Sequence, residues 1–468
     1  MDKLPKPLRV SPVFSTTSWL FWITLCFGAF LALYTPYKLL LMGLSQTNDG
    51  ALTFSALASF FLGTLSGAMG IRWCVLLMLS YIGISKHQAQ EDIPRDVQLP
   101  YVSILVPAHC EAQCIQDALS ALVNLDYPAY EVIVVDDGSD DETYQLALPF
   151  AGRHESDYGV CDVKVFTKPN QGKWSAHNFG LRRASGTLIL CIDADSRIDA
   201  GALRLMVRHM RDKRVGAVSG QIRVRNRGTL ITLLQSLEYV LANGAMRLSQ
   251  GVTGTVMIVP GPIGLFRREA LQRVQSEANQ DDQSHENLSV RGPFSRLTFA
   301  EDFHLSLSML SLGYRVVYEP HAVAHTKAPA NIPGLISQRY RWNRGTMQVL
   351  SWYVRRVLKG MRSPSRLNVW IVSTSLLDFY CMPIIYTILL GSLVMFLLSG
   401  GSLALLAIWG AAACLINIMS GHIYTIAHRD RASLLFLAPL FDCYQGILLH
   451  CAWLIATYDE CRGAGMRW

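Results

Sequence analysis

The sequence predicts an α/β domain with a mostly parallel, doubly wound sheet, inserted between α-helical segments that cross a membrane. Two observations support this prediction. Of the 468 residues, 51% are hydrophobic and only 16% are charged, and the apolar residues are concentrated in a few long runs. Between those runs, short apolar strands alternate with helical patterns, and polar residues follow the strands. Alternation of this kind is typical of a doubly wound sheet.

Long and nearly uncharged runs occur at 18–41, 52–84, 367–398, 402–426 and 433–457. Each contains the roughly 20 apolar residues that a helix needs to cross the hydrocarbon core of a bilayer. We therefore divide the chain into four parts. These are an N-terminal tail with two spans (1–84), a soluble α/β domain (85–328), amphipathic helices at the membrane surface (329–366) and three further spans (367–468).

The first two runs need closer inspection. We interpret 18–41 as a retained span, because it is too long for the apolar part of a signal peptide and has no clear cleavage site. Arg72 interrupts the second run. The second half of this run is therefore either a continuation of the same helix or a helix that lies along the membrane interface.

The distribution of Lys and Arg predicts the orientation of the chain. Three cations precede the first run and the loop 427–432 contains two arginines, whereas the loops 42–51 and 399–401 contain neither Lys nor Arg. By the positive-inside rule, the N-terminus and the large domain are cytoplasmic. Three spans after the domain would then place the C-terminus outside.

The net charge and the cysteine content bear on three questions: nucleic-acid binding, disulfide bonds and a zinc site. The net charge of +7 fits basic loops beside an anionic lipid surface, and no motif supports binding to nucleic acid. The eleven cysteines lack paired spacing and are expected to be reduced apolar residues. Cys110 and Cys114 lie near His109, but no second pair of ligands follows at a suitable distance, so a zinc site is not predicted there.

Pairs of acidic residues follow two of the predicted strands. Asp193 and Asp195 could hold a divalent cation through carboxylate oxygens. Asp136 and Asp137 form an acceptor pair that could read the N–H edge of a base. Each pair could also belong to an ordinary polar turn. Their place at the carboxyl ends of strands, where ligands bind in doubly wound sheets, favours a functional interpretation.

Two further positions could belong to the same site. Lys173 follows Gly172 and is a mobile charge suited to phosphate, although an exposed loop lysine would look the same. Glu301 and Asp302 begin a helical run. Carboxylates at the start of a helix often serve only to cap its N-terminus. Two together also suit a general base whose pKa is raised by a negatively charged neighbour.

The segment Gln338–Arg344 is dense in cations and includes a tryptophan. Gln338 and Arg341 are three residues apart and therefore share one face of a helix. The flat indole of Trp342 would suit the apolar face of a sugar. The alternative is a helix at the membrane surface with snorkelling arginines and a tryptophan anchor.

Taken in order, these motifs resemble those of the processive family 2 glycosyltransferases, which include the synthases of cellulose, hyaluronan, chitin oligosaccharides and poly-N-acetylglucosamine. The resemblance rests on Pro107-Ala-His-Cys-Glu111, Asp136-Asp137-Gly-Ser, Gly172-Lys173, Asp193-Ala-Asp195, Glu301-Asp302 and Gln338-x-x-Arg341-Trp342. It implies a GT-A-type fold for the α/β domain. It also implies a multi-pass protein of the bacterial inner membrane, with the catalytic domain in the cytoplasm.

The resemblance also implies a role for each residue of these motifs. Asp302 would be the catalytic base, and Asp193 and Asp195 would hold Mn²⁺ or Mg²⁺. A UDP-sugar donor would be bound by Glu111, Asp136, Asp137, Lys173 and Arg341. The acceptor would be bound by Glu301, Gln338 and Trp342, and by Gly261 and Gly264 in the segment Val259–Arg267.

A single base fits inversion at the anomeric carbon, so we expect a processive β-glycosyltransferase that makes an exopolysaccharide and translocates it. Ala300 stands where cellulose synthases have Thr, and we favour UDP-GlcNAc as the donor. The alternatives are a hyaluronan-, chitin-oligosaccharide- or glucan-type synthase, or a non-processive transferase that acts on a lipid-linked acceptor. The expected partners are the growing polysaccharide, the bilayer and accessory membrane or periplasmic export subunits.

Overall fold

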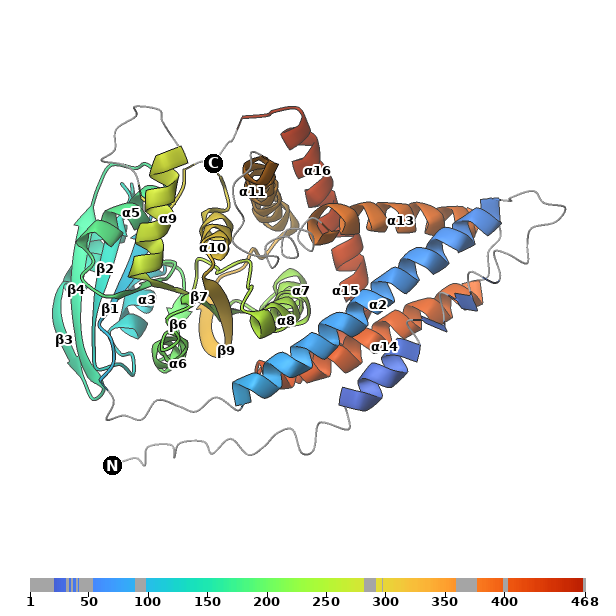
Figure 1. The fold of residues 1–468 in the computed structure, drawn as a ribbon, viewed down its shortest axis with the longest axis horizontal. Coiled ribbons are helices and arrows are strands. Elements are labelled where there is room, and N and C mark those ends of the chain that lie inside the picture. Colours follow the sequence, from blue (N-terminus) through green and yellow to red (C-terminus); the bar gives the residue numbers. More distant parts are fainter. Residues whose placement is uncertain are drawn as a thin grey trace.

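The protein is described here by a computed structural model. The structure describes residues 21–30, 33–34, 37–38, 41, 54–88, 98–281, 292–296, 298–358, 377–398 and 403–465. A nine-stranded sheet forms the centre of the soluble domain, and the apolar helices extend away from it (Figure 1).

The strand order in the sheet is β3-β4-β2-β1-β5-β8-β7-β9-β6. The strands are β1 (Val102–Ala108), β2 (Ala129–Asp136), β3 (Gly152–Ser156), β4 (Gly159–Thr167), β5 (Leu188–Cys191), β6 (Arg197–Ile198), β7 (Val215–Val224), β8 (Gly264–Arg267) and β9 (Arg315–Thr326). The pairs β1–β2, β1–β5, β2–β4 and β7–β9 are parallel, and the other pairs are antiparallel. The predicted α/β fold is confirmed, and the sheet is more mixed than expected because β8 enters antiparallel to both of its neighbours.

Helices cover both faces of this sheet. Those of the soluble domain are α3 (Ile115–Leu122), α4 (Thr143–Ala147), α5 (Lys173–Arg183), α6 (Ala202–His209), α7 (Leu230–Glu238), α8 (Ala245–Thr253), α9 (Arg268–Asp281) and α10 (Glu301–Ser311), with the short segments η1 (Leu148–Phe150) and η2 (Tyr239–Gly244). Within β1, Ile104 and Val106 pack in the cluster that includes α3 and α6, whereas Leu105 packs in the cluster that includes α5, α9 and α10. Strands buried on both faces are expected to be near-continuous apolar runs, as β1 and β2 are apart from Ser103 and Glu131, which are hydrogen-bonded to each other.

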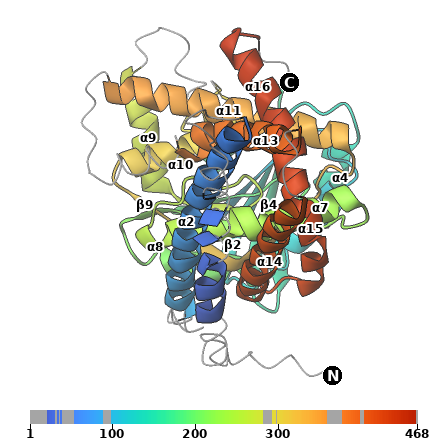
Figure 2. The ribbon, with the colours of Figure 1, turned by 90° about the vertical axis from the view of Figure 1, so that its right-hand side faces the viewer.

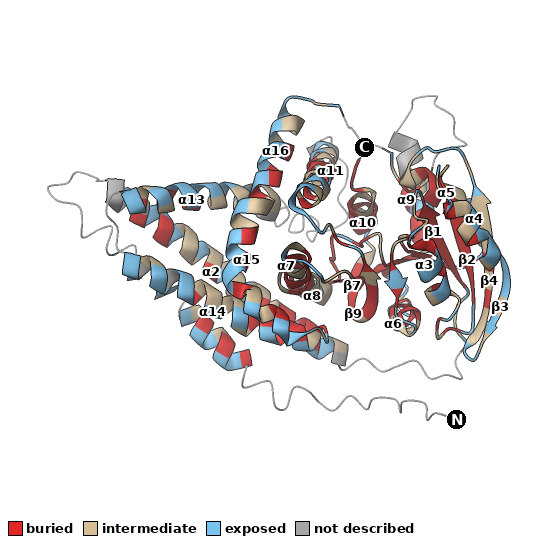
Figure 3. Ribbon diagram, turned by 180° about the vertical axis from the view of Figure 1, so that it is seen from behind, coloured by how far each residue is buried: buried red, intermediate tan, exposed pale blue. Residues whose placement is uncertain are grey.

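Within the described ranges, four helical segments are long and apolar enough to cross a membrane: Ser59–His87, Phe379–Leu398, Leu406–Ala427 and Ala432–Cys461. The helices involved are α2 (Phe54–Gln88), α13 (Met382–Leu398), α14 (Leu403–Ala427), α15 (Ala438–Cys443) and α16 (His450–Cys461), with η4 (Leu377–Cys381), η5 (Ala432–Leu437) and η6 (Tyr444–Leu449). Exposed residues are frequent along α13 and α14 (Figure 3), as expected for helices that contact lipid. Of the first predicted span, Phe21–Phe30 are helical, and most of the remainder lies outside the described residues.

The helix α2 is continuous through Arg72, which answers the question that the sequence left open. Its 35 residues extend over about 52 Å, more than the roughly 30 Å of a hydrocarbon core. The last turns pack on α8 of the soluble domain, where a Cβ at Gly83 would lie 2.6 Å from the Leu248 carbonyl oxygen. The Lys86 ammonium donates to the Val252 carbonyl oxygen at 3.2 Å. The membrane helix is therefore anchored directly on the domain (Figure 2).

The loop 427–432 lies against the same domain. The guanidinium of Arg227 contacts both carboxylate oxygens of Asp430, at 2.8 and 2.9 Å, and Arg223 donates to the His428 carbonyl oxygen. A paired, nearly buried contact of this kind holds the loop against the domain. The side of the membrane on which both lie stays a prediction.

The last apolar segment, predicted to cross the membrane, has polar contacts at both of its ends. It begins beside the domain at Asp430 and ends at Glu460, whose carboxylate accepts from Arg344 of α11 (Ile332–Leu358) at 3.0 Å. Because α11 packs on the domain, both ends of this segment have partners beside the domain, and α15 and α16 run across the direction of α13 and α14 (Figure 1). Ala432–Cys461 is long and apolar enough to cross a membrane, and the crossing over 433–457 stays a prediction. The contacts of Arg344 with Glu460 and the Ala464 carbonyl oxygen, which composition does not reveal, hold the end of α16 at α11.

Candidate active site

The parallel strands β1, β2 and β5 end at one edge of the sheet, and most of the predicted polar residues lie there. In the registers of these strands, Ala108 pairs with Asp136 and Leu105 with Cys191. Because parallel strands end together, Glu111, Asp137 and Asp193 emerge from neighbouring loops. The prediction that these motifs share one site is therefore supported by their placement.

Lys173 lies at the centre of this group. As the first residue of α5, it places its ammonium 2.6 Å from Asp193 Oδ1 and 3.8 Å from Glu301 Oε1. Gly261 lies against the same ion pair, because a Cβ at this position would be 2.8 Å from Lys173 Nζ and 3.1 Å from Asp193 Oδ1. Only a glycine allows the backbone to approach so closely. Segments far apart in the sequence thus meet at one charged centre.

Two carboxyl groups at the start of α10 have altered acidity. Burial raises the pKa of Glu301 to about 7, Lys173 opposes this shift and Asp302 adds to it. Burial also raises the pKa of Asp302, against the effects of Lys173 and of the Phe303 N–H group. Asp302 Oδ1 accepts from that N–H group at 2.8 Å. Carboxylates with a raised pKa are suited to take up a proton.

A second acidic group lies beside the first. Burial raises the pKa of Glu111 to about 7, and the charges of Asp195 and Asp193 add to this effect. Burial and Asp193 raise the pKa of Asp195, which accepts from Ser196 Oγ at 2.9 Å and from Thr326 Oγ1 at 3.3 Å. Neighbouring carboxylate oxygens repel one another, and a hard divalent cation bound between them would offset this repulsion. The residues present therefore fit a Mn²⁺ or Mg²⁺ ion.

Asp136 and Asp137 are both buried, but their contacts differ. Asp137 forms an ion pair with Lys168 and accepts from the Gly172 N–H group at 2.7 Å, so it orders the turn that leads to Lys173. Asp136 Oδ2 accepts from Thr167 Oγ1 at 2.8 Å, and its Oδ1 has only a long contact, 3.4 Å, with the Ser139 N–H group. Of the two, Asp136 retains more capacity to accept a further hydrogen bond.

The sequence did not reveal two contributors to this site. Arg247 of α8 lies close enough to Asp302 for the charge of each to act on the pKa of the other. Ser306 accepts from the Val259 N–H group at 3.0 Å and donates to the Asp302 carbonyl oxygen at 2.7 Å, which ties the segment with Gly261 to α10. The second bond follows an i, i+4 spacing that could have been noticed. Arg247 gave no local signal, because only the folding of the chain brings α8 to α10.

The helix α11 runs beside the start of α10. A Cβ at Gly345 would lie 2.6 Å from the Ala300 backbone nitrogen, and Thr298 Oγ1 donates to the Gly345 carbonyl oxygen at 3.1 Å. Trp342, one turn earlier, is 41% exposed. The Arg339 guanidinium lies 4.2 Å from the centre of its ring and covers one face. Trp342 is thus partly covered by Arg339 and partly open to a ligand.

Two predicted residues of α11 stand apart from the charged centre. Arg341 is exposed and forms no ion pair with the carboxylates that the structure describes. Gln338 has a buried side-chain oxygen that lacks a hydrogen-bond partner among the described residues. Gly264 lies in β8, where a Cβ would be 2.6 Å from Val259 Cγ1 and close to the Phe266 ring, so its space is filled by the protein core and not by the site.

Trp342 also lines a cavity of about 520 Å³ between α11 and the apolar helices. The cavity walls combine aromatic and polar side chains, an unusual mixture among membrane helices: Trp73, Tyr386, Tyr424, Trp453, Arg72, Asn417 and Asp442. The Asn417 amide donates to Asp442 at 3.1 Å. Polar residues at membrane depth normally line a path or a site.

Comparison with known proteins agrees with this geometry. Residues 103–275 match the family described as glycosyl transferase family 2. The matched residues make up most of the α/β domain, which is therefore similar to the family 2 glycosyltransferases. The chain is 31% identical over 254 residues to a poly-β-1,6-N-acetyl-D-glucosamine synthase of Staphylococcus epidermidis, covering 54% of this chain and 56% of that protein. It is 30% identical over 268 residues to the synthase of the same name from Staphylococcus aureus strain COL, covering 57% of this chain and 60% of that protein.

The chain spans little more than half the length of the curated relatives that it matches. Its fold is similar to that of a solved mannosyltransferase from Pyrobaculum calidifontis, in complex with GDP-Man and Mn²⁺. The TM-score is 0.59 at 20% identity, with 88% of this chain and all of that chain covered. At this identity the likeness concerns the fold alone, and it confirms the predicted GT-A-type architecture.

Proposed function

We propose that this protein is a processive, inverting β-glycosyltransferase of the bacterial inner membrane that transfers GlcNAc from UDP-GlcNAc to a growing polysaccharide. One observation carries the proposal. The candidate base Asp302 lies beside the Lys173–Asp193 centre, and the neighbouring helix presents Trp342 to a cavity between apolar helices. The names of the Staphylococcus relatives support the choice of sugar.

The donor would bind at the edge of the sheet. Lys173 would contact the diphosphate as a point charge, and Asp136, with its weakly used oxygen, would accept from the uracil N–H group. Asp193, Asp195 and the nearby Glu111 would hold the divalent cation, which when bound neutralises charge on the diphosphate. Asp137 would act indirectly, because its carboxylate is already used to shape the turn before Lys173.

The transfer itself needs one base. The acceptor hydroxyl oxygen attacks the anomeric carbon, the bond from that carbon to the phosphate oxygen breaks, and UDP leaves with the electron pair. The hydroxyl proton passes to Asp302, whose Oδ2 is the better placed oxygen because Oδ1 already accepts from the Phe303 N–H group. A single displacement inverts the configuration, and hence an α-linked donor gives a β-linkage. Glu301 and the buried Arg247 would set the charge around this base.

The acceptor would leave the site along α11. Trp342 would stack on a sugar of the growing chain with its uncovered face, and Gln338 would offer its unpartnered oxygen to a sugar hydroxyl. The aromatic and polar cavity beyond Trp342 would then receive the polymer. Arg341, exposed in this structure, would reach the diphosphate only after a rearrangement of its side chain.

The proposal is tested with the full-length protein in detergent, supplied with radiolabelled UDP-GlcNAc and Mn²⁺. The product is digested with linkage-specific hydrolases and sized. Asp302→Asn should still bind UDP-GlcNAc but lose transfer by about 10²- to 10⁴-fold, as expected for loss of a general base. Asp157→Asn, at an exposed turn between β3 and β4, is the matched control. Polymer made at a normal rate by Asp302→Asn would exclude this base, and single-sugar products on a lipid would exclude processivity.

A further inference from the structure

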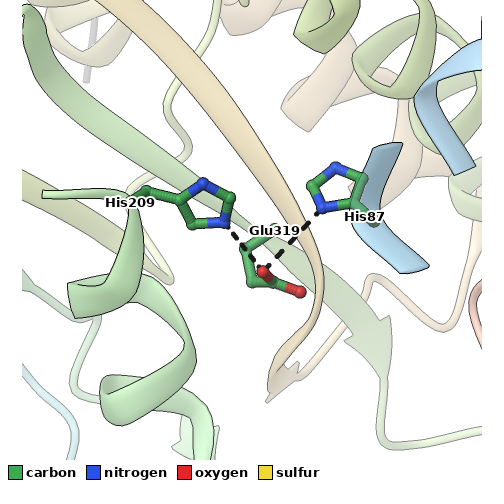
Figure 4. A group of neighbouring side chains, drawn as sticks. All are labelled: His87, His209 and Glu319. Carbon is green, nitrogen blue, oxygen red and sulfur yellow. Dashed lines mark hydrogen bonds and ion pairs between the residues drawn. The ribbon is translucent and has the colours of Figure 1, made fainter. Parts of the chain in front are cut away.

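Three ligand-type side chains from distant parts of the chain converge at the junction between α2 and the soluble domain (Figure 4). His87 comes from the last turn of α2, His209 from the end of α6 and Glu319 from the middle of β9. One ligand atom from each lies within 4.8 Å of the others. Glu319 is fully buried and the side chain of His87 is 12% exposed. The two histidines line a cavity of about 460 Å³.

The separations fit ligands of one small ion. His209 Nε2 lies 2.8 Å and His87 Nδ1 lies 4.0 Å from Glu319 Oε2. Ligands at roughly 2.1 Å from a tetrahedral Zn²⁺ ion are about 3.4 Å apart, so the two distances lie about 0.6 Å on either side. Small side-chain rotations would equalise them. The imidazole rings are not stacked, with an angle of 74° between their planes, so both can direct a nitrogen toward one point.

The environment of His87 is independent evidence for a bound metal ion. Its Nδ1 atom is buried and has no hydrogen-bond partner among the described residues, and the 4.0 Å to Glu319 is too long for a hydrogen bond. A buried polar atom without a partner is costly and calls for a ligand. The nitrogen faces a carboxylate and a second imidazole, which is the donor set of many zinc sites.

The surroundings of Glu319 also resemble the support of a metal ligand. Arg208 donates to Oε2 at 2.6 Å, and the His321 backbone N–H group donates to Oε1 at 3.0 Å. Metal-bound carboxylates are usually held by such outer hydrogen bonds. The His321 ring nitrogen lies 3.8 Å from Oε1, so a further imidazole is within reach of the group. Arg208 also allows the opposite description, a metal-free network in which its charge alone balances Glu319.

We propose that His87, His209 and Glu319 bind a divalent transition-metal ion of the zinc type, which fastens the end of the membrane helix α2 to the catalytic domain. This site is distinct from the predicted Asp193–Asp195 cation site. Both lie along β9, because Thr326 of the same strand contacts Asp195, and seven residues of strand separate Thr326 from Glu319 by about 23 Å. The proposal rests on the junction geometry and not on the proposed sugar transfer.

The test measures metal bound by the full-length protein. The background is Asp193→Asn/Asp195→Asn, which removes the predicted catalytic cation, so retained metal belongs elsewhere. After growth with added zinc and dialysis, we expect about one equivalent of zinc by mass spectrometry. We expect less than about one fifth of this amount in His87→Ala and His209→Ala. His154→Ala, at a half-buried histidine of β3 whose ring forms a hydrogen bond with the Phe150 carbonyl oxygen, is the matched control.

Titration with Co²⁺ distinguishes loss of the metal site itself from loss of zinc that is caused by misfolding. The metal-free background protein should give the absorption of tetrahedral cobalt, and His87→Gln, which keeps side-chain volume, should not. Size-exclusion chromatography shows whether each variant is folded. Absence of both zinc and cobalt from a folded background protein would overturn the proposal and establish the metal-free network around Arg208. Equal metal in His87→Gln and the background protein would overturn it as well.

Discussion

Gly261 packs closely against the charged centre of the candidate active site, and its replacement by alanine gives a sharp test of the site's geometry. The added Cβ would lie 2.8 Å from Lys173 Nζ, whereas ordinary contacts begin near 3.4 Å, so the ammonium must move by about 0.6 Å. The Asp193 oxygens, at 3.1 and 3.2 Å, must also yield slightly. Displacements near 1 Å can cost about 10²-fold in rate. We therefore expect a 10- to about 100-fold lower kcat/KM, which is up to about 2.7 kcal/mol.

The assay follows UDP release and polymer formation by full-length Gly261→Ala, with thermal unfolding measured in parallel. The unfolding midpoint should hardly change, because the methyl group meets side-chain ends at the site and not the core. Gly228→Ala is the control, because a Cβ there would meet no atom within 4 Å. If Gly261→Ala retained kcat/KM within about twofold of the native value, the placement of this glycine against the donor centre would be refuted.

Three further predictions follow from other contacts. With the pKa of Glu111 raised to about 7, protons compete with a cation below that pH, so Mn²⁺ affinity measured by calorimetry should rise up to about pH 7 and then level off. Glu111→Gln should flatten the profile, and an unchanged slope would contradict this role. Trp342→Ala should shorten the polymer more than it slows UDP release, and equal losses would argue against stacking on the acceptor. Arg227→Ala and Asp430→Ala should each destabilise the protein by about 3 kcal/mol, and the double variant should cost less than their sum. Strict additivity would show that this pair does not couple the loop to the domain.

Much of the site could be predicted because its residues follow strands or begin helices. Lys173 and Asp302 are both at helix starts, and Asp193 and Asp195 follow a buried strand, so local pattern alone placed them at one edge of the sheet. The antiparallel entry of β8 could not be predicted, because a four-residue apolar strand carries no signal of direction. The predicted fold class is nevertheless correct, because the neighbouring parallel strands still end at the same edge of the sheet.

Long-range contacts explain the other differences. Arg247 and the junction residues of α2 are ordinary positions in the sequence, and their significance depends on which elements fold together. The last apolar segment has the composition of a membrane span, yet ion pairs and hydrogen bonds at both ends hold it beside the domain. Hydropathy indicates whether a helix tolerates lipid, but it does not show on which side of the membrane each end lies.

The charges of the site also constrain the order of binding. Among the described residues, the carboxyl groups of Glu111, Asp193, Asp195, Glu301 and Asp302 outnumber the cations that act on them, which are Lys173, Arg247 and Lys327. A nucleoside diphosphate adds further negative charge to a partly buried, already acidic site, where repulsion is weakly screened. The donor should therefore bind measurably only together with a divalent cation, or at a pH low enough to protonate the groups whose pKa is near 7. Calorimetric titration with UDP, with and without Mn²⁺, at pH 6 and pH 8 distinguishes these cases. Strong cation-free binding at pH 8 would mean that the acidic cluster does not face the donor.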